Sequence, residues 1–156
     1  MRGEKHLIYR GGKLPDPFIK PVTYKPEFFQ KELDLESEVS YELRKSNDIQ
    51  PYRINQSSSR DIEEIKAFFS KNSNSFFFLF DNDNLVGSIL FLRNYIQSLS
   101  IAADYQRQGY GTKLTKYAIN RILDKGYSSV ELNILPGNIE AEYLYKKLGF
   151  VEVTDQ

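Results

Sequence analysis

The chain has 156 residues, the length of one domain, and its 21 basic and 21 acidic residues cancel to a formal net charge of zero. This balance argues against a general nucleic-acid or membrane-surface binder, because both classes usually carry a basic excess. The chain has no cysteine and a single histidine, His6, so a disulfide framework, a thiolate zinc site and an acyl-cysteine intermediate are excluded and no metal site is expected.

The N-terminal segment, residues 1–17, is expected to be an irregular lead-in to a single domain at residues 18–156. It contains a Gly-Gly pair and two prolines, and its apolar patch at residues 6–9 is too short for a signal peptide. No apolar run of the sequence approaches the roughly 20 residues of a membrane span. We therefore expect a cytoplasmic protein without membrane contact.

The first half of the domain begins with a predicted edge strand at residues 18–24, which tolerates its proline. Apolar residues then recur at helical spacing from about residue 26 to residue 45 and predict a helix. A second helix is expected to follow, with Ser58 or Ser59 as its N-cap.

Three strands are predicted next. Residues 76–80 and 85–92 are continuous apolar runs joined by four turn-forming residues, which indicates an antiparallel hairpin buried on both faces. Residues 95–101 alternate as a further strand. The four phenylalanines of the first run are interpreted as core rather than as a ligand platform.

The second half contains a predicted helix at residues 111–125, a strand at 129–135, a last helix between its cap Asn138 and Gly149, and a strand at about 150–153. The order is β-α-α-β-β-β-α-β-α-β. This order predicts a mixed α/β fold in which helices cover a mixed sheet, with a strand-helix-strand crossover in its second half.

The segment at residues 99–112 runs from a strand through a glycine-bearing loop into a helix. Such a loop directs free backbone N–H groups and the positive end of the helix dipole at an anion, and Gly109 and Gly111 allow a phosphate to approach closely. The segment completes neither the dinucleotide fingerprint nor the P-loop. It indicates a pyrophosphate site, although Gly-x-Gly before a helix is more often a plain loop.

At this segment the chain resembles the GNAT superfamily of acyltransferases, whose signature Gln/Arg-x-x-Gly-x-Gly/Ala is met by Gln106-Arg107-Gln108-Gly109-Tyr110-Gly111. A second element agrees with it: Asn138-x-x-Ala141-x-x-Leu144-Tyr145-x-x-Leu148-Gly149-Phe150 resembles the family's final helix and following strand. The resemblance implies an N-acetyltransferase that uses acetyl-CoA as cosubstrate and needs no metal.

The resemblance also implies a set of cofactor-binding residues. Leu99 and Ile101 would offer backbone groups to the thioester carbonyl and the pantetheine arm, with Ser100 between them in the same segment. Asn138 would meet the pantetheine, and Tyr145 would meet the thioester sulfur. The pyrophosphate would be held by backbone amides of the loop, from Gln106, Arg107, Gln108, Gly109, Tyr110, Gly111 and Thr112.

Tyr145 is the expected general acid, because a phenol can protonate a departing thiolate; alternatively it is a structural residue at helical spacing. The general base is not assigned. Family members often carry a glutamate on the strand that corresponds to residues 95–101, but this strand has no acid or histidine. Either the base lies elsewhere, with Glu131, Asp81 and Asp83 as poor candidates, or the amine loses its proton to water along a polar path. We therefore keep two alternatives: a non-catalytic acyl-CoA-binding or regulatory module, and an interaction domain without a cofactor.

Local charge adds to these expectations. Residues 104–125 hold five cations and two anions, a net charge of +3 that favours a polyphosphate nearby, whereas residues 27–48 carry a net charge of −4. The acidic helix is either a solvated face or, since the first helices border the acceptor site in the family, a sign of a cationic amine acceptor. The identity of the amine, in a small molecule or a protein, does not follow from the sequence.

The C-terminus departs from the family, whose members usually end with two strands after the last helix. Only residues 150–153 are available for a strand here, so the final strand is expected to be missing. The chain would then be truncated, leave a sheet edge open or borrow a strand from a partner. An open edge favours self-association, and we expect a possible homodimer.

Overall fold

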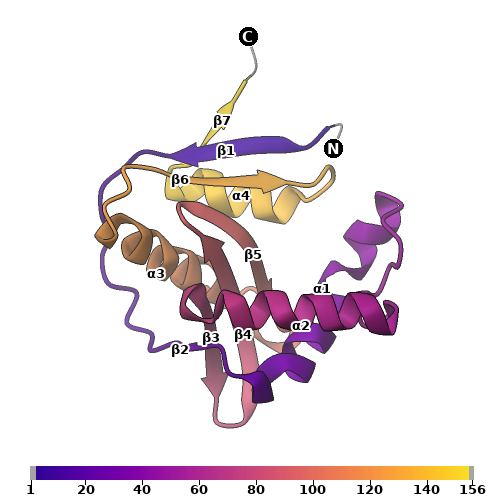
Figure 1. The fold of residues 1–156 in the computed structure, drawn as a ribbon. Coiled ribbons are helices and arrows are strands. Elements are labelled where there is room, and N and C mark those ends of the chain that lie inside the picture. The colour runs from indigo at the N-terminus through magenta and orange to yellow at the C-terminus, as the bar shows by residue number, and fades with distance from the viewer. Residues whose placement is uncertain (1–2, 155–156) are drawn as a thin grey trace.

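The structure, a computed structural model, describes residues 3–154 and contains one mixed sheet with helices on both faces (Figure 1). Its strands are β1 (Lys5–Tyr9), β2 (Val22–Thr23), β3 (Phe76–Asp81), β4 (Asn84–Leu92), β5 (Tyr95–Ile101), β6 (Val130–Ile134) and β7 (Val151–Val153). Its helices are α1 (Phe29–Ser46), α2 (Ser59–Lys71), α3 (Tyr110–Asp124) and α4 (Ile139–Leu148). The sheet order is β2-β3-β4-β5-β6-β1-β7, with β5 and β6 parallel and the other neighbours antiparallel.

Two apolar clusters cover the two faces of the sheet. Under α1 and α2, the rings of Phe76 and Phe78 pack with Phe29 and Phe69. On the other face, Leu114, Ala118, Ile119 and Ile122 of α3 and Tyr145 of α4 pack on Phe77, Ile89 and Phe91. The hairpin of β3 and β4 is therefore buried on both faces, as its continuous apolar runs predict. Each large side chain buried here stabilises the fold by about 1.5–3 kcal/mol.

The predicted helix ends are confirmed where a cap defines them. The side chain of Ser58 accepts a hydrogen bond from the N–H of Asp61 (3.2 Å), and the side chain of Asn138 accepts one from the N–H of Ala141 (3.2 Å). Gly149, with φ of +111°, ends α4 in the left-handed conformation. These caps place α2 and α4 within a residue of their expected starts.

The N-terminal segment is not an irregular lead-in throughout. Its apolar patch forms β1, which lies between β6 and β7 in the interior of the sheet and pairs antiparallel with both (Figure 1). Leu7 is fully buried opposite Leu132. A five-residue strand beside a Gly-Gly pair gives a weak local signal, and its partners lie more than 120 residues further along the chain.

The sheet therefore does not lack a strand next to β7. The strand expected from the C-terminus or from a partner is supplied by the N-terminus of the same chain. β7 is the last strand of the sheet, and among residues 3–154 its outer edge has no strand partner, so self-association stays a prediction. The folded unit also includes β1, so its boundary lies before residue 18.

The first predicted strand, residues 18–24, is reduced to Val22–Thr23. Phe18 adopts a left-handed φ of +57° with its side chain exposed, and Pro17 and Pro21 lack the N–H groups that a strand ladder needs.

Within residues 3–154 no helix has both the length and the apolar character required to cross a bilayer.

Candidate active site

The parallel strands β5 and β6 are paired at one end only. Tyr95 lies opposite Glu131, and the N–H of Glu131 donates to the carbonyl of Asn94 (2.8 Å). Beyond this point no described residue of β5 is paired with β6. From Ile96 to Ile101, the edge of β5 that faces β6 therefore has no strand partner.

The register of β5 on β4 decides which backbone groups face this free edge. The N–H of Ala102 donates to the carbonyl of Val86 (2.8 Å), and Ser100 lies opposite Ser88. Because backbone groups alternate between the two edges of a strand, those of Ser100 face β4 and those of Leu99 and Ile101 face β6. The carbonyl of Ile101 accepts from the side chain of Gln106 (2.9 Å), which ties the following loop to the end of β5.

The loop delivers a free helix N-terminus. Gly109, the N-cap of α3, has φ of +89°, a conformation that favours glycine, and its carbonyl accepts the first helical bond, from the N–H of Lys113 (3.0 Å). The N–H groups of Tyr110, Gly111 and Thr112 have no backbone acceptor among residues 3–154. Three donors and the positive end of a 15-residue helix are thus available to an anion.

Gly111 has a second role that the sequence does not reveal. A Cβ at this position would stand 3.0 Å from Cδ1 of Leu144, so the absence of a side chain lets α3 approach α4 closely.

Two other residues of the motif form side-chain contacts at the loop. The side chain of Gln108 donates to the carbonyl of Asp104 (2.9 Å), and Arg107 is paired with Glu140 at 3.8 Å.

Tyr145 lies on the buried side of α4. Its side chain is 7% exposed, and its ring packs edge-on against Phe150 with 5.4 Å between the ring centroids. Burial raises the pKa of the Tyr145 phenol, so the hydroxyl keeps its proton at neutral pH, as a proton donor must. Asn138 stands at the start of the same helix, where its side-chain oxygen is used as the cap.

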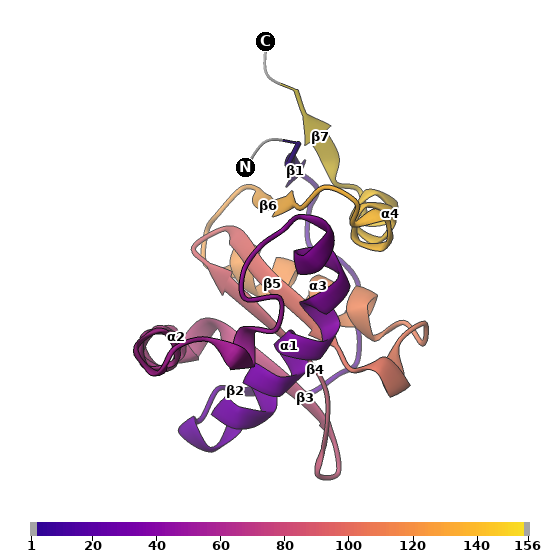
Figure 2. The same cartoon turned by 90° about the vertical axis from the view of Figure 1, so that its right-hand side faces the viewer.

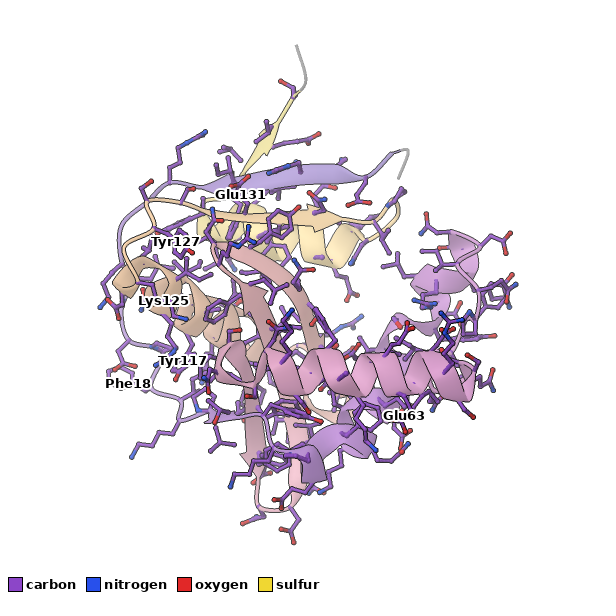
Figure 3. All side chains as sticks on the ribbon, in the orientation of Figure 1. Phe18, Glu63, Tyr117, Lys125, Tyr127 and Glu131 are labelled. Carbon is purple, nitrogen blue, oxygen red and sulfur yellow. The ribbon has the colours of Figure 1, made fainter. Side chains whose placement is uncertain are left out.

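The net positive charge of residues 104–125 is not concentrated at the loop. Arg121 lies over the ring of Phe77, at 4.8 Å from its centroid. Lys125, labelled in Figure 3, lies 5.3 Å from the centroid of the Phe91 ring. Arg121 is eleven residues beyond the start of α3, roughly 16 Å along the helix axis. Of the five cations in residues 104–125, Arg107, Lys113 and Lys116 lie within two helical turns of the start of α3.

The family follows from the segments that form this geometry. The sequence model of the acetyltransferase (GNAT) family matches residues 40–150, which include the whole of β5, the loop, α3, β6 and α4. The chain belongs to the GNAT acetyltransferase family. The predicted mixed α/β fold and family resemblance are both confirmed by this match and by the structural neighbours below.

Curated relatives of this GNAT chain are acetyltransferases of amines. It is 31% identical over 83 residues to N-alpha-acetyltransferase 30 of Schizosaccharomyces pombe, covering 47% of this chain and 55% of that protein. It is 36% identical over 61 residues to the thialysine N-epsilon-acetyltransferase of Bos taurus, covering 39% and 36%. It is 35% identical over 57 residues to the [ribosomal protein bS18]-alanine N-acetyltransferase of Escherichia coli K12, covering 36% and 38%. The matches thus span about half or less of each relative's length.

Solved structures share the fold at low sequence identity. A protein from Pyrococcus horikoshii OT3 matches with a TM-score of 0.64 at 22% identity, covering 97% of this chain and 92% of that one. A GCN5-related N-acetyltransferase from Sphaerobacter thermophilus matches with a TM-score of 0.65 at 16% identity, covering 96% and 48%. These likenesses establish the arrangement of elements in the GNAT chain.

The acids named as poor base candidates are engaged elsewhere. Glu131 is hydrogen-bonded to His6 (2.8 Å) and accepts from the side chain of Asn94 (3.1 Å), at the paired end of β5 and β6 (Figure 3). Asp81 accepts from the hydroxyl of Tyr105 (3.0 Å), and Asp83 lies in the turn between β3 and β4. All three acids lie outside the stretch of β5, residues 96–101, that has no strand partner.

Two neighbouring carboxyls on α1 of this GNAT chain, Glu32 and Glu36, are functional candidates that the sequence alone did not single out. Glu32 is 0% exposed, and its Oε1 accepts from the hydroxyl of Ser88 (2.6 Å), while its Oε2 has no donor among the described residues. The carboxyl of Glu36 lies beside it, close enough to share a proton. A signal existed, because Phe29, Glu32, Leu33 and Glu36 follow the i, i+3, i+4, i+7 spacing of one helix face.

We expect Glu32→Gln to stabilise the protein above pH 4.5. Burial, then the neighbouring Glu36, raises the pKa of Glu32 well above its ordinary 4.5. A carboxyl with a raised folded-state pKa loses its stabilising effect as the pH rises from its unfolded pKa through its folded pKa, by about 1.4 kcal/mol per unit of difference. Urea denaturation at a series of pH values should give a flatter curve for the variant than for wild type. Exposed Glu38→Gln is the control, and parallel curves for Glu32→Gln and wild type would refute the assignment.

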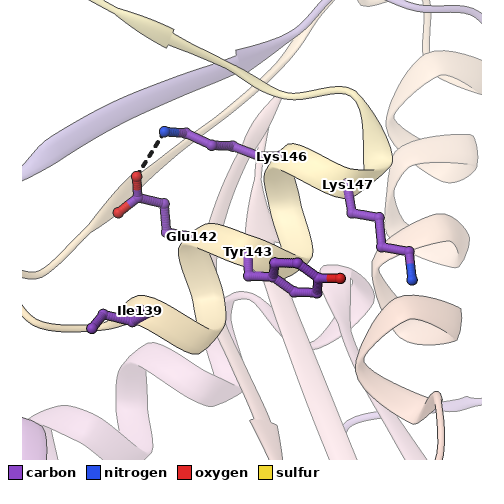
Figure 4. Close-up of a pocket in the computed structure, with 5 residues that line it drawn as sticks. All are labelled: Ile139, Glu142, Tyr143, Lys146 and Lys147. Carbon is purple, nitrogen blue, oxygen red and sulfur yellow. Dashed lines mark hydrogen bonds and ion pairs between the residues drawn. The ribbon is translucent and has the colours of Figure 1, made fainter.

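A shallow hollow of about 530 Å³ lies elsewhere, on the outer face of α4 (Figure 4). It is lined by Ile139, Glu142, Tyr143, Lys146 and Lys147, and Glu142 is paired with Lys146 at 2.7 Å. None of the residues predicted to bind a cofactor lines it. Residues 3–154 contain no cluster of His, Asp and Glu side chains arranged to hold a metal ion.

Proposed function

We propose that this chain binds acetyl-CoA along β5 and the start of α3 and transfers the acetyl group to a primary amine by direct attack. The observation that carries this proposal is the continuity of residues 99–112. The free backbone edge of β5 leads through a short loop to three N–H groups without backbone acceptors among the described residues. One extended ligand with an anionic middle and a carbonyl at one end matches such a segment.

The helix end suits a pyrophosphate. The N–H groups of Tyr110, Gly111 and Thr112 point along the axis of α3, and Gly109 has no atom within 4 Å of its missing Cβ. Arg107 and Lys113 add cations next to these donors. Backbone donors, the helix dipole and nearby cations together favour binding of a phosphate group.

The free edge of β5 suits the reacting end. Acetyl-CoA would supply an acetyl thioester there. The N–H groups of Leu99 and Ile101 can donate to a carbonyl oxygen that gains negative charge, and Tyr145 can donate its proton to a leaving sulfur. Burial keeps Tyr145 protonated, and the same raised pKa makes it a weaker acid than a free phenol.

The acceptor is proposed to be a primary amine of a protein N-terminus or of a lysine-like side chain. The names of the relatives support both classes, since they refer to N-alpha, alanine and thialysine acetylation. An acceptor screen should therefore include thialysine, spermidine and peptides with free N-terminal alanine or methionine.

Calorimetric titration with acetyl-CoA, followed by this screen, tests the proposal. We expect micromolar binding and turnover of at least one amine. Binding without turnover would favour the non-catalytic acyl-CoA-binding module, and the absence of binding by folded protein would refute the proposal.

Tyr145→Phe should lower kcat roughly ten- to a hundredfold while leaving the Kd for acetyl-CoA within about threefold. The variant keeps the ring that packs on Phe150 and removes only the hydroxyl. Tyr143→Phe is the matched control, because Tyr143 lies on the same helix with its side chain exposed. Equal kcat values for wild type and Tyr145→Phe would show that Tyr145 is a structural residue.

A further inference from the structure

The acceptor amine needs a group that removes its proton, and β5 carries no acid. We infer that Glu36 of α1 is the proton acceptor for the amine and that Glu32 positions it. This inference rests on the proposed function and adds to it the residue that receives the proton.

The position of α1 brings Glu36 over β5. Near its start, Phe29 packs on the side chains of β3, and one turn later Glu32 contacts Ser88 of β4. After its end, the side chain of Asn47 donates to the carbonyl of Pro136, just beyond β6 (3.0 Å). The helix therefore crosses the sheet from β3 towards β6, as Figure 2 shows.

Glu36 is one turn beyond Glu32, about 6 Å along this path, and neighbouring strands are about 4.8 Å apart. The next strand after β4 is β5, whose edge at residues 96–101 has no strand partner. Because α1 also contacts β5, we place Glu36 over the strand proposed to hold the thioester.

The sheet presents polar groups to this pair. Ser100 lies directly opposite Ser88, so both side chains project from the same face of the sheet, the face covered by α1. Ser100 is buried. A buried hydroxyl of β5, next in sequence to Leu99 and Ile101, therefore lies on the sheet face that α1 covers.

The second oxygen of Glu32 has no donor among residues 3–154, and it can carry the proton that Glu32 donates to the Glu36 carboxylate. The pair is thus a neutral acid beside a carboxylate, and the carboxylate is the group able to accept a proton from an amine. The charged and titratable groups around the pair are Arg44 on α1 and Tyr24 after β2. Tyr24 is buried, and its hydroxyl has no partner among the described residues.

Glu36 has the exposure and the basicity that the step requires. Its side chain is half-buried, whereas Glu32 is closed off from solvent. Burial raises the pKa of Glu36, although a hydrogen bond from Glu32 and the charge of Arg44 oppose the rise. In the step, an ammonium group gives one proton to the Glu36 carboxylate and becomes a neutral amine with a free electron pair. The proton then passes to solvent.

The test compares Glu36→Gln with Glu38→Gln, whose side chain is exposed on the same helix. With an amine from the screen, Glu36→Gln should lose at least a hundredfold in kcat and lose the acidic limb of the kcat/KM profile against pH. The Kd for acetyl-CoA should stay within twofold. Glu38→Gln should match wild type within twofold.

Two variants of Glu32 separate positioning from mere packing. Glu32→Gln keeps a donor towards Glu36 and should keep the pH profile, whereas Glu32→Leu removes the donor and should move the acidic limb to higher pH. Unchanged kcat in Glu36→Gln would overturn the inference alone. Failure of wild type to bind acetyl-CoA, or to acetylate any amine of the screen, would overturn both this inference and the proposed function.

Discussion

Replacing Leu7 by Asp is expected to abolish the folded state at 25 °C. Leu7 is 0% exposed at the centre of β1 and lies opposite Leu132 of β6 and Glu152 of β7. Removing a large core side chain costs about 2–5 kcal/mol, and burying an unpaired carboxylate costs several more. That loss is comparable to the whole stability of a typical domain, about 5–15 kcal/mol. Circular dichroism during urea denaturation measures it.

The matched control is Gly12→Asp, which adds the same charge five residues away, where no atom lies within 4 Å of the new Cβ. This variant should unfold within 0.5 kcal/mol of wild type, the usual limit for a surface substitution. A chain that begins at residue 13 should also be unstable and should regain structure when a peptide of residues 1–12 is added. If the truncated chain is stable and the peptide does not change its stability, β1 is not required for folding.

Thr112→Asp is expected to weaken acetyl-CoA binding about a hundredfold. The substitution adds a negative charge beside the N–H groups proposed to hold the pyrophosphate. Like charges about 5 Å apart at an effective dielectric constant near 20 repel by about 3 kcal/mol. An acid in the first turn also interacts favourably with the helix dipole, so the melting temperature should not fall. Loss of affinity would therefore not result from unfolding.

Thr112→Asn is the control, because it has nearly the same shape as Asp and no charge, and it should bind within threefold of wild type. Gly111→Asp is a poorer test, since its Cβ would collide with Leu144 and disturb the packing of α3 on α4. Calorimetry at low salt gives both affinities. Equal affinities for Thr112→Asp and Thr112→Asn would place the anion elsewhere.

Much of the second half of the fold could be predicted from local signals. The strand at Tyr95–Ile101 has the bounds that its alternating pattern predicts, and Asn138 and Gly149 bound α4 as expected. Caps, glycine stops and apolar periodicity are signals that span only a few residues, so they can be recognised without knowing which elements pack together. The Gln106–Gly111 motif belongs to this class, because it encodes a turn and a helix start.

The sequence by itself thus determined the family, the order of most elements and the residues of the candidate cofactor segment. Tertiary structure alone decided the place of β1, because its backbone hydrogen bonds and side-chain burial depend on partner strands that lie more than 120 residues away. It also decided which acids are buried. The spacing of Phe29 and Leu33 marks the helix face that carries Glu32 and Glu36, but only the packing of this face on Ser88 shows that Glu32 is fully buried, since burial depends on the neighbouring surface and not on residue type.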